Sequence, residues 1–145
     1  MGEFNFNSQI CTDKNQSERL LALGLKKETA DMHWRLQPYY NDEGFDCGLE
    51  WSCNIGTFLQ ENACELFFDY IPAWSLHRLI EMIPENVSDD WLGVSFDEIS
   101  YYHGEGKDMI GWKYYKAGNL YDCIIECYEW LIENGSFKKE YLCEK

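Results

Sequence analysis

The chain has 145 residues, a length typical of one domain, and 46% of them are apolar, so we expect a single domain over residues 1–145. Its formal net charge is −14 at pH 7, and so acidic a surface repels phosphate backbones, whose binding depends on lysine and arginine. We therefore expect no direct binding of nucleic acid, and because no run of about 18 apolar residues is present we expect no membrane contact.

The negative charge is concentrated in the middle of the chain. Residues 36–106 hold fourteen acidic residues and one basic residue, Arg78, whereas the acidic and basic residues of 1–35 balance each other. Three interpretations stay open: the charge keeps the protein soluble, it docks a basic partner protein, or it imitates nucleic acid. Aromatic residues make up 17% of the chain, and they either fill the core or line an interface.

The seven cysteines form no recognisable disulfide or metal-binding pattern. Because the first residues lack the basic-then-apolar pattern of a secretion signal, we expect reduced thiols and a cytoplasmic location. Cys123 and Cys127 stand four residues apart, as two zinc ligands on one helical face would, but a zinc site needs four ligands, or three and an open position. We therefore expect buried thiols, no metal and no cofactor.

The first third of the chain predicts two helices followed by a loop. Thr12 can cap a helix over about residues 13–23, and Gly24 ends it. A second short helix is predicted over residues 29–34. Several turn-forming residues between 37 and 48 predict a loop.

Strands are predicted in the middle of the chain. Apolar and polar residues alternate over 49–53, which is typical of a half-buried strand, and a turn region over 54–62 separates it from a second strand over 64–70. The alternation near 91–116, interrupted by the glycine-rich residues 103–106, predicts a β-hairpin with a longer loop.

Two further helices complete the predicted order. Pro72 suits the first turn of a helix, and Pro84 would end it. The C-terminal helix is predicted over residues 119–134, because Asn119 can cap its start and Gly135 fits the position just past its end. Helices, strands, a hairpin and a last helix suit an α+β fold with helices packed on a small antiparallel sheet.

An acidic stripe runs along one side of the C-terminal helix. Its carboxylates recur at helical spacing and have no basic neighbour within the helix: Asp122, Glu126, Glu129 and Glu133. Like charges at this spacing cost a few tenths of a kcal/mol each, roughly, in isolated helices. Either packing of the core compensates for that cost, or Lys113, Lys116 or a partner offsets the charge. The four carboxylates of the stripe are therefore the candidate partner-binding group.

Three blocks of the sequence resemble a known family: residues 15–32, the block Ile71-Pro72-Ala73-Trp74-Ser75-Leu76 continuing to Pro84, and residues 121–142. Together they look like a family of small uncharacterised proteins of phages, prophages and other mobile elements of anaerobic gut bacteria. The resemblance covers about half of the chain and implies the cytoplasm of an infected or lysogenic bacterium as the context. It implies no activity, ligand or catalytic residue.

Several functions are compatible with these observations. The favoured hypothesis is a non-catalytic accessory protein that binds a basic protein partner through an acidic, aromatic-rich surface. An enzyme or small-ligand binder is the alternative, but no spacing unites His33, His77 and His103 with the thiols and carboxylates, and His77 is expected at the surface. A nucleic-acid-mimicking inhibitor and an oligomer with aromatic residues between its subunits are further alternatives, so the oligomeric state stays open.

Overall fold

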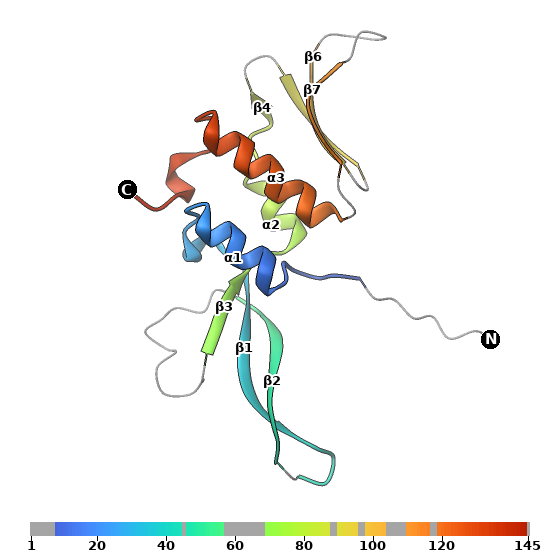
Figure 1. Cartoon of the computed structure of the whole chain (residues 1–145), viewed down its shortest axis with the longest axis vertical. Coiled ribbons are helices and arrows are strands. Elements are labelled where there is room, and N and C mark those ends of the chain that lie inside the picture. The colour runs from blue at the N-terminus through green and yellow to red at the C-terminus, as the bar shows by residue number, and fades with distance from the viewer. Residues whose placement is uncertain are drawn as a thin grey trace, which may run out of the picture.

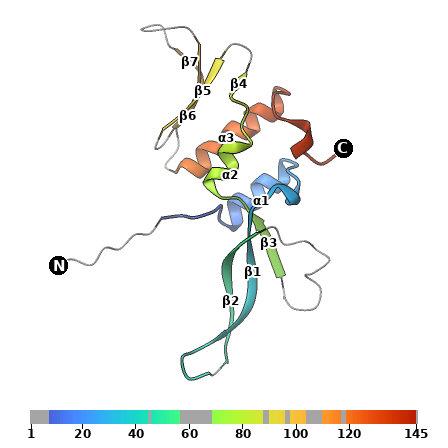
Figure 2. The same cartoon turned by 180° about the vertical axis from the view of Figure 1, so that it is seen from behind.

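The computed structural model describes residues 8–44, 46–56, 69–87, 90–95, 98–103, 110–116 and 119–144. Within these ranges, the helices lie between two antiparallel sheets, and one of these sheets projects away from the helices (Figure 1). The view from behind shows the same arrangement (Figure 2). The predicted α+β class is confirmed, and the described residues form two small antiparallel sheets where one was predicted.

Helix α1 (Lys14–Ala22) begins one residue later than predicted, because Asp13 rather than Thr12 caps it. The backbone N–H of Gln16 donates to the Asp13 carboxylate at 2.7 Å, and the backbone N–H of Asp13 donates to the Gln16 side chain at 3.1 Å. This reciprocal pair satisfies two N–H groups that the first turn leaves open. The helix ends as predicted, with Gly24 in the left-handed region at a φ of 99°.

A long β-hairpin follows, where a helix and a loop were predicted. Strand β1 (Met32–Tyr40) pairs with strand β2 (Asp46–Ile55), and of the predicted helix only a short 3₁₀ turn, η1 (Lys27–Thr29), forms nearby. Both predictions are wrong. From residue 32 onward apolar and polar side chains alternate with the period of a strand, and the tight turn closed by the Asn41 carbonyl and the Gly44 N–H, at 2.9 Å, uses only a few of the turn-forming residues.

Strand β3 (Asp69–Ala73) pairs with β1, so that β1 is the central strand of the sheet β2-β1-β3. Pro72 lies in this edge strand opposite His33, where a missing N–H is tolerated, and does not begin a helix as predicted. Helix α2 (Leu76–Glu81) starts only after Ser75, whose hydroxyl accepts a hydrogen bond from the Arg78 N–H. Residues 57–68, which include most of the predicted strand over 64–70, lie outside the described residues.

The second sheet has the order β4-β5-β6-β7. Its strands are β4 (Asn86–Val87), β5 (Asp90–Val94), β6 (Glu98–His103) and β7 (Ile110–Lys116). The hairpin predicted near residues 91–116 is confirmed, with its first arm divided into β5 and β6. The loop predicted between its arms lies mostly outside the described residues, which include His103 only at the end of β6.

Helix α3 (Leu120–Glu133) agrees with the helix predicted over residues 119–134. The N–H of Tyr121 donates to the Asn119 side chain at 2.8 Å, which caps the start. At the other end Gly135 has a φ of 69°, and the N–H of Ser136 reaches back to the carbonyl of Leu131 at 2.8 Å. The chain then closes on the helices through a 3₁₀ turn, η4 (Lys139–Tyr141).

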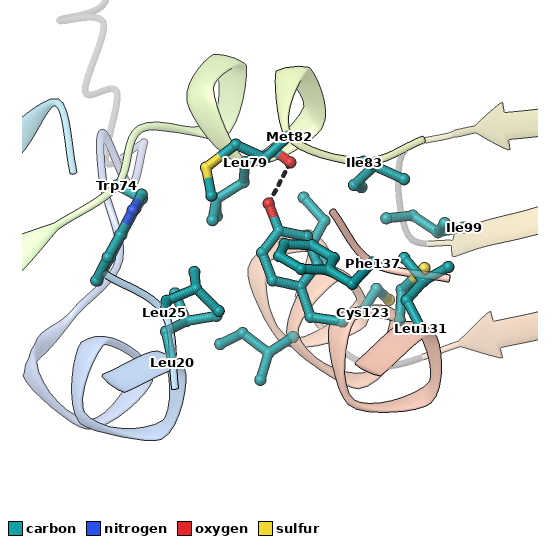
Figure 3. Packing of buried hydrophobic residues seen from close by; sticks show 14 of the residues in the cluster. Leu20, Leu25, Trp74, Leu79, Met82, Ile83, Ile99, Cys123, Leu131 and Phe137 are labelled. Carbon is teal, nitrogen blue, oxygen red and sulfur yellow. Dashed lines mark hydrogen bonds between the residues drawn. The ribbon is translucent and has the colours of Figure 1, made fainter. Parts of the chain in front are cut away.

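One apolar cluster joins α1, α2, β6 and α3. Figure 3 shows Leu20, Leu25 and Trp74 at one end of this cluster, and Ile99 and Leu131 at the other. Among the described residues, no side chain of β1 or β2 belongs to it, so the core lies between the helices and the second sheet. No helix in the described part of the chain combines the length and the apolar character needed to cross a membrane.

Trp74 connects the first sheet to this core. The side chain is fully buried, and its indole N–H donates to the Thr29 hydroxyl at 3.0 Å. The backbone N–H of Thr12 donates to the carbonyl of Trp74 at 2.9 Å, and the backbone N–H of Trp74 donates to the Thr12 hydroxyl at 3.1 Å. The segment before α1, the 3₁₀ turn and the end of β3 are therefore held together at one point.

Candidate protein-binding surfaces

The acidic stripe of α3 lies beside α1, and Arg19 of α1 contacts two of its four members. Nη2 of Arg19 lies 3.1 Å from the Glu129 carboxylate, and Nη1 lies 4.0 Å from that of Asp122. The basic group that offsets the stripe is thus Arg19, which the sequence analysis did not consider. The side chains of Lys113 and Lys116, the two residues it did consider, lie outside the described part of the structure.

Asp122 also takes part in packing the two helices together. It accepts a hydrogen bond at 2.8 Å from the side chain of Gln16, the same residue that completes the cap of α1. Asp122 lies in the first turn of α3, where the positive end of the helix dipole favours a carboxylate. Its position therefore has a structural explanation that needs no partner.

The other two carboxylates are differently placed. Glu126 is half-buried and Glu133 is exposed, and neither forms an ion pair with another described residue. Because half-exposed ion pairs contribute only about 0–1 kcal/mol, even the pairs made by Arg19 leave this surface open to competition. Of the predicted partner-binding group, Asp122 and Glu129 are therefore paired with Arg19, whereas Glu126 and Glu133 form no ion pair with another described residue.

The first sheet has one apolar and one polar face, which follow from its register. Leu36 lies opposite Trp51, and Trp34 lies opposite both Cys53 on β2 and Ile71 on β3. Because directly opposite residues point to the same side, these residues share a face. We call it the apolar sheet face, and among the side chains that the structure describes it comprises Met32, Trp34, Leu36, Pro38, Tyr40, Leu49, Trp51, Cys53, Ile55, Ile71 and Ala73. The register also sets Asp69 opposite Leu36 and Asp46 opposite Tyr40.

Residues 11–14, which lead into α1, contact this face near the helices. The indole N–H of Trp34 donates to the carbonyl of Thr12 at 2.8 Å. The ammonium group of Lys14 lies 4.7 Å from the centre of the Trp51 ring, within the range of a cation–π interaction. The sulfur atoms of Cys11 and Cys53 are 2.9 Å apart.

Much of the apolar sheet face stays exposed. The exposed fractions are 59% for Tyr40, 52% for Leu49 and 89% for Ile55, while Trp34 and Trp51 are half-buried. Single exposed apolar residues are normal on a soluble protein, but several on one face of this hairpin, which adds no described side chain to the apolar cluster, make the face a candidate binding surface.

Negative charge predominates in the same hairpin, whose one basic residue other than histidine is Arg35 of β1. Between residues 36 and 56 the sequence contains four acidic residues, Asp42, Glu43, Asp46 and Glu50, and no lysine or arginine. Asp42 and Glu43 are exposed in the turn, and Glu50 is exposed on the polar face of β2. Asp42 and Glu43 therefore lie at the turn end of the apolar sheet face, whereas Glu50 and Arg35 belong to the polar face.

Two of the three histidines, His33 and His77, have side chains that the structure describes. Nδ1 of His33, which is 6% exposed, lies 2.8 Å from the backbone carbonyl of Gly56, an interaction that holds the end of β2. His77 is exposed, as predicted, and the side chain of His103 lies outside the described part. Across the described ranges, no three histidine, cysteine or acidic side chains come close enough to hold a metal ion.

Cys123 and Cys127 both belong to the apolar cluster and are fully buried. Burial raises the pKa of the Cys127 thiol to about 12, because the charged thiolate would lose its hydration. Both thiols act as small apolar side chains of the core.

A serine–carboxylate contact between Ser75 and Asp31 was not foreseen. The Ser75 hydroxyl bonds to the Asp31 carboxylate, which also accepts the Ser75 N–H at 2.8 Å. Since Ser75 is the N-cap of α2, the contact ties that helix to the segment before β1. The only signal for this contact in the sequence is that Asp31, a residue that often accepts hydrogen bonds from backbone N–H groups, directly precedes a strand.

Comparison of the chain with protein-family models, with curated proteins and with solved structures finds no match. The surfaces described above are therefore the basis for inferring a function.

Proposed function

We propose that this protein is a non-catalytic binding module that docks a basic protein partner through the apolar sheet face and the carboxylates around it. The observation that carries the proposal is the exposure of Tyr40, Leu49 and Ile55 on strands β1 and β2. Among the described residues, neither strand contributes a side chain to the apolar cluster of the core. An apolar, aromatic centre with a polar rim is the usual composition of a protein interface.

The charge of the hairpin identifies the chemistry of the partner. A partner with acidic residues around its own apolar patch would be repelled by the four carboxylates between residues 36 and 56. A patch that combines apolar side chains with lysine or arginine complements both features. In the context that the phage resemblance implies, such a partner is a phage or host protein of the bacterial cytoplasm.

The acidic stripe of α3 is the competing docking surface on the same molecule. It offers charge but little apolar area, and Arg19 already contacts Asp122 and Glu129. Its unpaired members, Glu126 and Glu133, therefore provide matched control positions for an experiment on the sheet.

The proposal is tested by capture of proteins from a bacterial lysate with three immobilised proteins: the wild type, a Tyr40→Ser/Leu49→Ser variant and a Glu126→Gln/Glu133→Gln variant. We expect the sheet variant to lose captured basic proteins by about tenfold or more, because each truncated side chain removes about 1 kcal/mol or more of apolar contact. The stripe variant should capture the same proteins as the wild type, and capture should fall as salt increases.

Equal capture by the wild type and the sheet variant would show that the apolar sheet face is not the docking surface. Loss of capture in the stripe variant alone would assign docking to α3. Duplex DNA serves as a competitor: if it displaces the captured protein, the chain acts as a mimic of nucleic acid. Circular dichroism of each variant checks that the fold is retained.

A further inference from the structure

Cys11 and Cys53 form a pair of thiols in contact, although 42 positions separate them in the sequence. Their sulfur atoms are 2.9 Å apart, and a disulfide bond requires about 2.05 Å, so a movement of less than about 1 Å would join them. Cys11 lies just before α1, and Cys53 lies on β2. Of the three other cysteines whose side chains are described, Cys123 and Cys127 are buried on α3 and Cys143 is exposed.

Hydrogen bonds on both sides fix the positions of these two residues. The residue after Cys11 is Thr12, whose N–H donates to the carbonyl of Trp74 at 2.9 Å and whose carbonyl accepts from the Trp34 indole at 2.8 Å. Trp34 is in turn the direct β1 neighbour of Cys53. Because the backbones on both sides are anchored, the closeness of the two sulfur atoms follows from the fold.

The two thiols differ in access. Cys11 is 1% exposed, whereas Cys53 is half-buried and can be reached by a small molecule. Burial, the hydrogen bond with Cys53 and the nearby carboxylates of Asp31 and Asp13 hold the pKa of Cys11 well above its ordinary value. Cys11 is therefore the poorer first nucleophile of the pair.

We propose that Cys11 and Cys53 are a redox-active modification site that closes into an intramolecular disulfide by exchange with a small-molecule disulfide. The Cys53 thiolate attacks one sulfur of the reagent, forms a mixed disulfide and releases one equivalent of the small thiolate. Cys11 then loses its proton to solvent and attacks the Cys53 sulfur, and the second small thiolate leaves. The two protein thiols are oxidised by two electrons and the reagent is reduced to two thiols.

The bond would tie residues 11–14 covalently to β2. It would constrain the unfolded chain and so raise the melting temperature by about 5–15 °C. It would also keep the chain segment fixed where Thr12 and Lys14 contact Trp34 and Trp51 on the apolar sheet face. That second effect rests on the proposed function, whereas formation of the bond does not.

The test uses the full-length protein, first reduced and freed of reductant, and then treated with oxidised glutathione. We expect a digest without reductant to contain one linked peptide that joins Cys11 to Cys53, lighter by two hydrogen atoms than the two free peptides, and no glutathione on either of these cysteines. Cys143→Ser should give the same linked peptide as the wild type, because that exposed thiol takes no part in the bond. Cys11→Ser should stop at a stable glutathione adduct on Cys53, since the second thiol is missing.

The mapping of the linked peptide needs no variant and decides the matter even if Cys11→Ser does not fold. A wild type that keeps a glutathione adduct on Cys53 without closing the bond would overturn the proposal. So would a linked peptide that joins either cysteine to another one. Neither result depends on a partner, so a failure here is distinct from a failure of the docking proposal.

Discussion

Cys127 and Tyr128 are neighbours on α3, and both point into the apolar cluster. Burial raises the pKa of Cys127 to about 12, and it raises that of the Tyr128 phenol well above its ordinary value. The Tyr128 hydroxyl also donates to the carbonyl of Leu79 on α2, so the neutral phenol helps to join two helices. These groups are therefore held in their protonated form by the fold itself.

Protonation of these groups makes stability depend on pH in the alkaline range. In the unfolded chain they release protons near their ordinary pKa values, whereas the folded protein retains them, so above about pH 9 the unfolded state binds fewer protons. The free energy of unfolding should be constant just below about pH 9 and should fall as the pH rises toward about 12. Urea denaturation followed by tryptophan fluorescence, with reductant present, measures it.

A matched variant isolates the thiol. In Cys127→Ala the free energy of unfolding should fall less steeply with rising pH than in the wild type. This holds however much stability the small cavity costs. A urea midpoint that does not change between about pH 8 and about pH 11 would show that burial does not keep these groups protonated.

At the scale of elements, α3 could be predicted because its signals are local. The capping residue Asn119, the apolar stripe and Gly135 all lie within one turn of the helix or inside it. The hairpin of β1 and β2 could not be predicted in the same way. Its turn-forming residues are spread through the strands. Pro38, which lies opposite Leu49, and Gly48, which lies opposite Tyr39, look like loop residues until the partner strand is known.

The acidic stripe shows the same limit. Its carboxylates could be placed on one side of a helix from their spacing, but the contact with Arg19 joins residues more than 100 positions apart. It depends on how α1 packs beside α3, and no local pattern encodes that packing. The contact of Cys11 with Cys53 depends likewise on where the chain before α1 crosses the first sheet.

Arg19→Met tests the significance of the ion pairs on α3. Because the side chains of all three partners are 40–44% exposed, we expect the free energy of unfolding to fall by less than about 1 kcal/mol. The methionine keeps most of the apolar stem, so packing against α3 is largely retained. Chemical denaturation of both proteins at the same salt concentration measures the difference.

The same variant separates the two docking surfaces. Removing Arg19 leaves Asp122 and Glu129 without their basic neighbour, so a partner that docks on the stripe should bind the variant more tightly. Docking on the apolar sheet face predicts affinities that differ by less than about twofold. A much larger gain in affinity would move the docking site to α3.

The whole molecule combines a helical core with a first sheet that projects from it (Figure 1). Most residues of the core belong to the sequence blocks on which the phage resemblance rests, among them Trp74, Leu79 and Tyr128. Apart from Met32, the hairpin of the first sheet lies outside those blocks, and it carries both exposed apolar side chains and a net negative charge. This division between a packed scaffold and a projecting sheet is the physical basis of the binding-module proposal.

Hydrogen exchange of the complex tests this account most directly, once a captured basic partner has been purified. With the partner bound, amides of residues 34–40 and 48–55 should exchange more slowly, while those on the exposed side of α3 should exchange as in the free protein. Slower exchange confined to α3, with the hairpin unchanged, would contradict the claim that the projecting sheet is the docking surface.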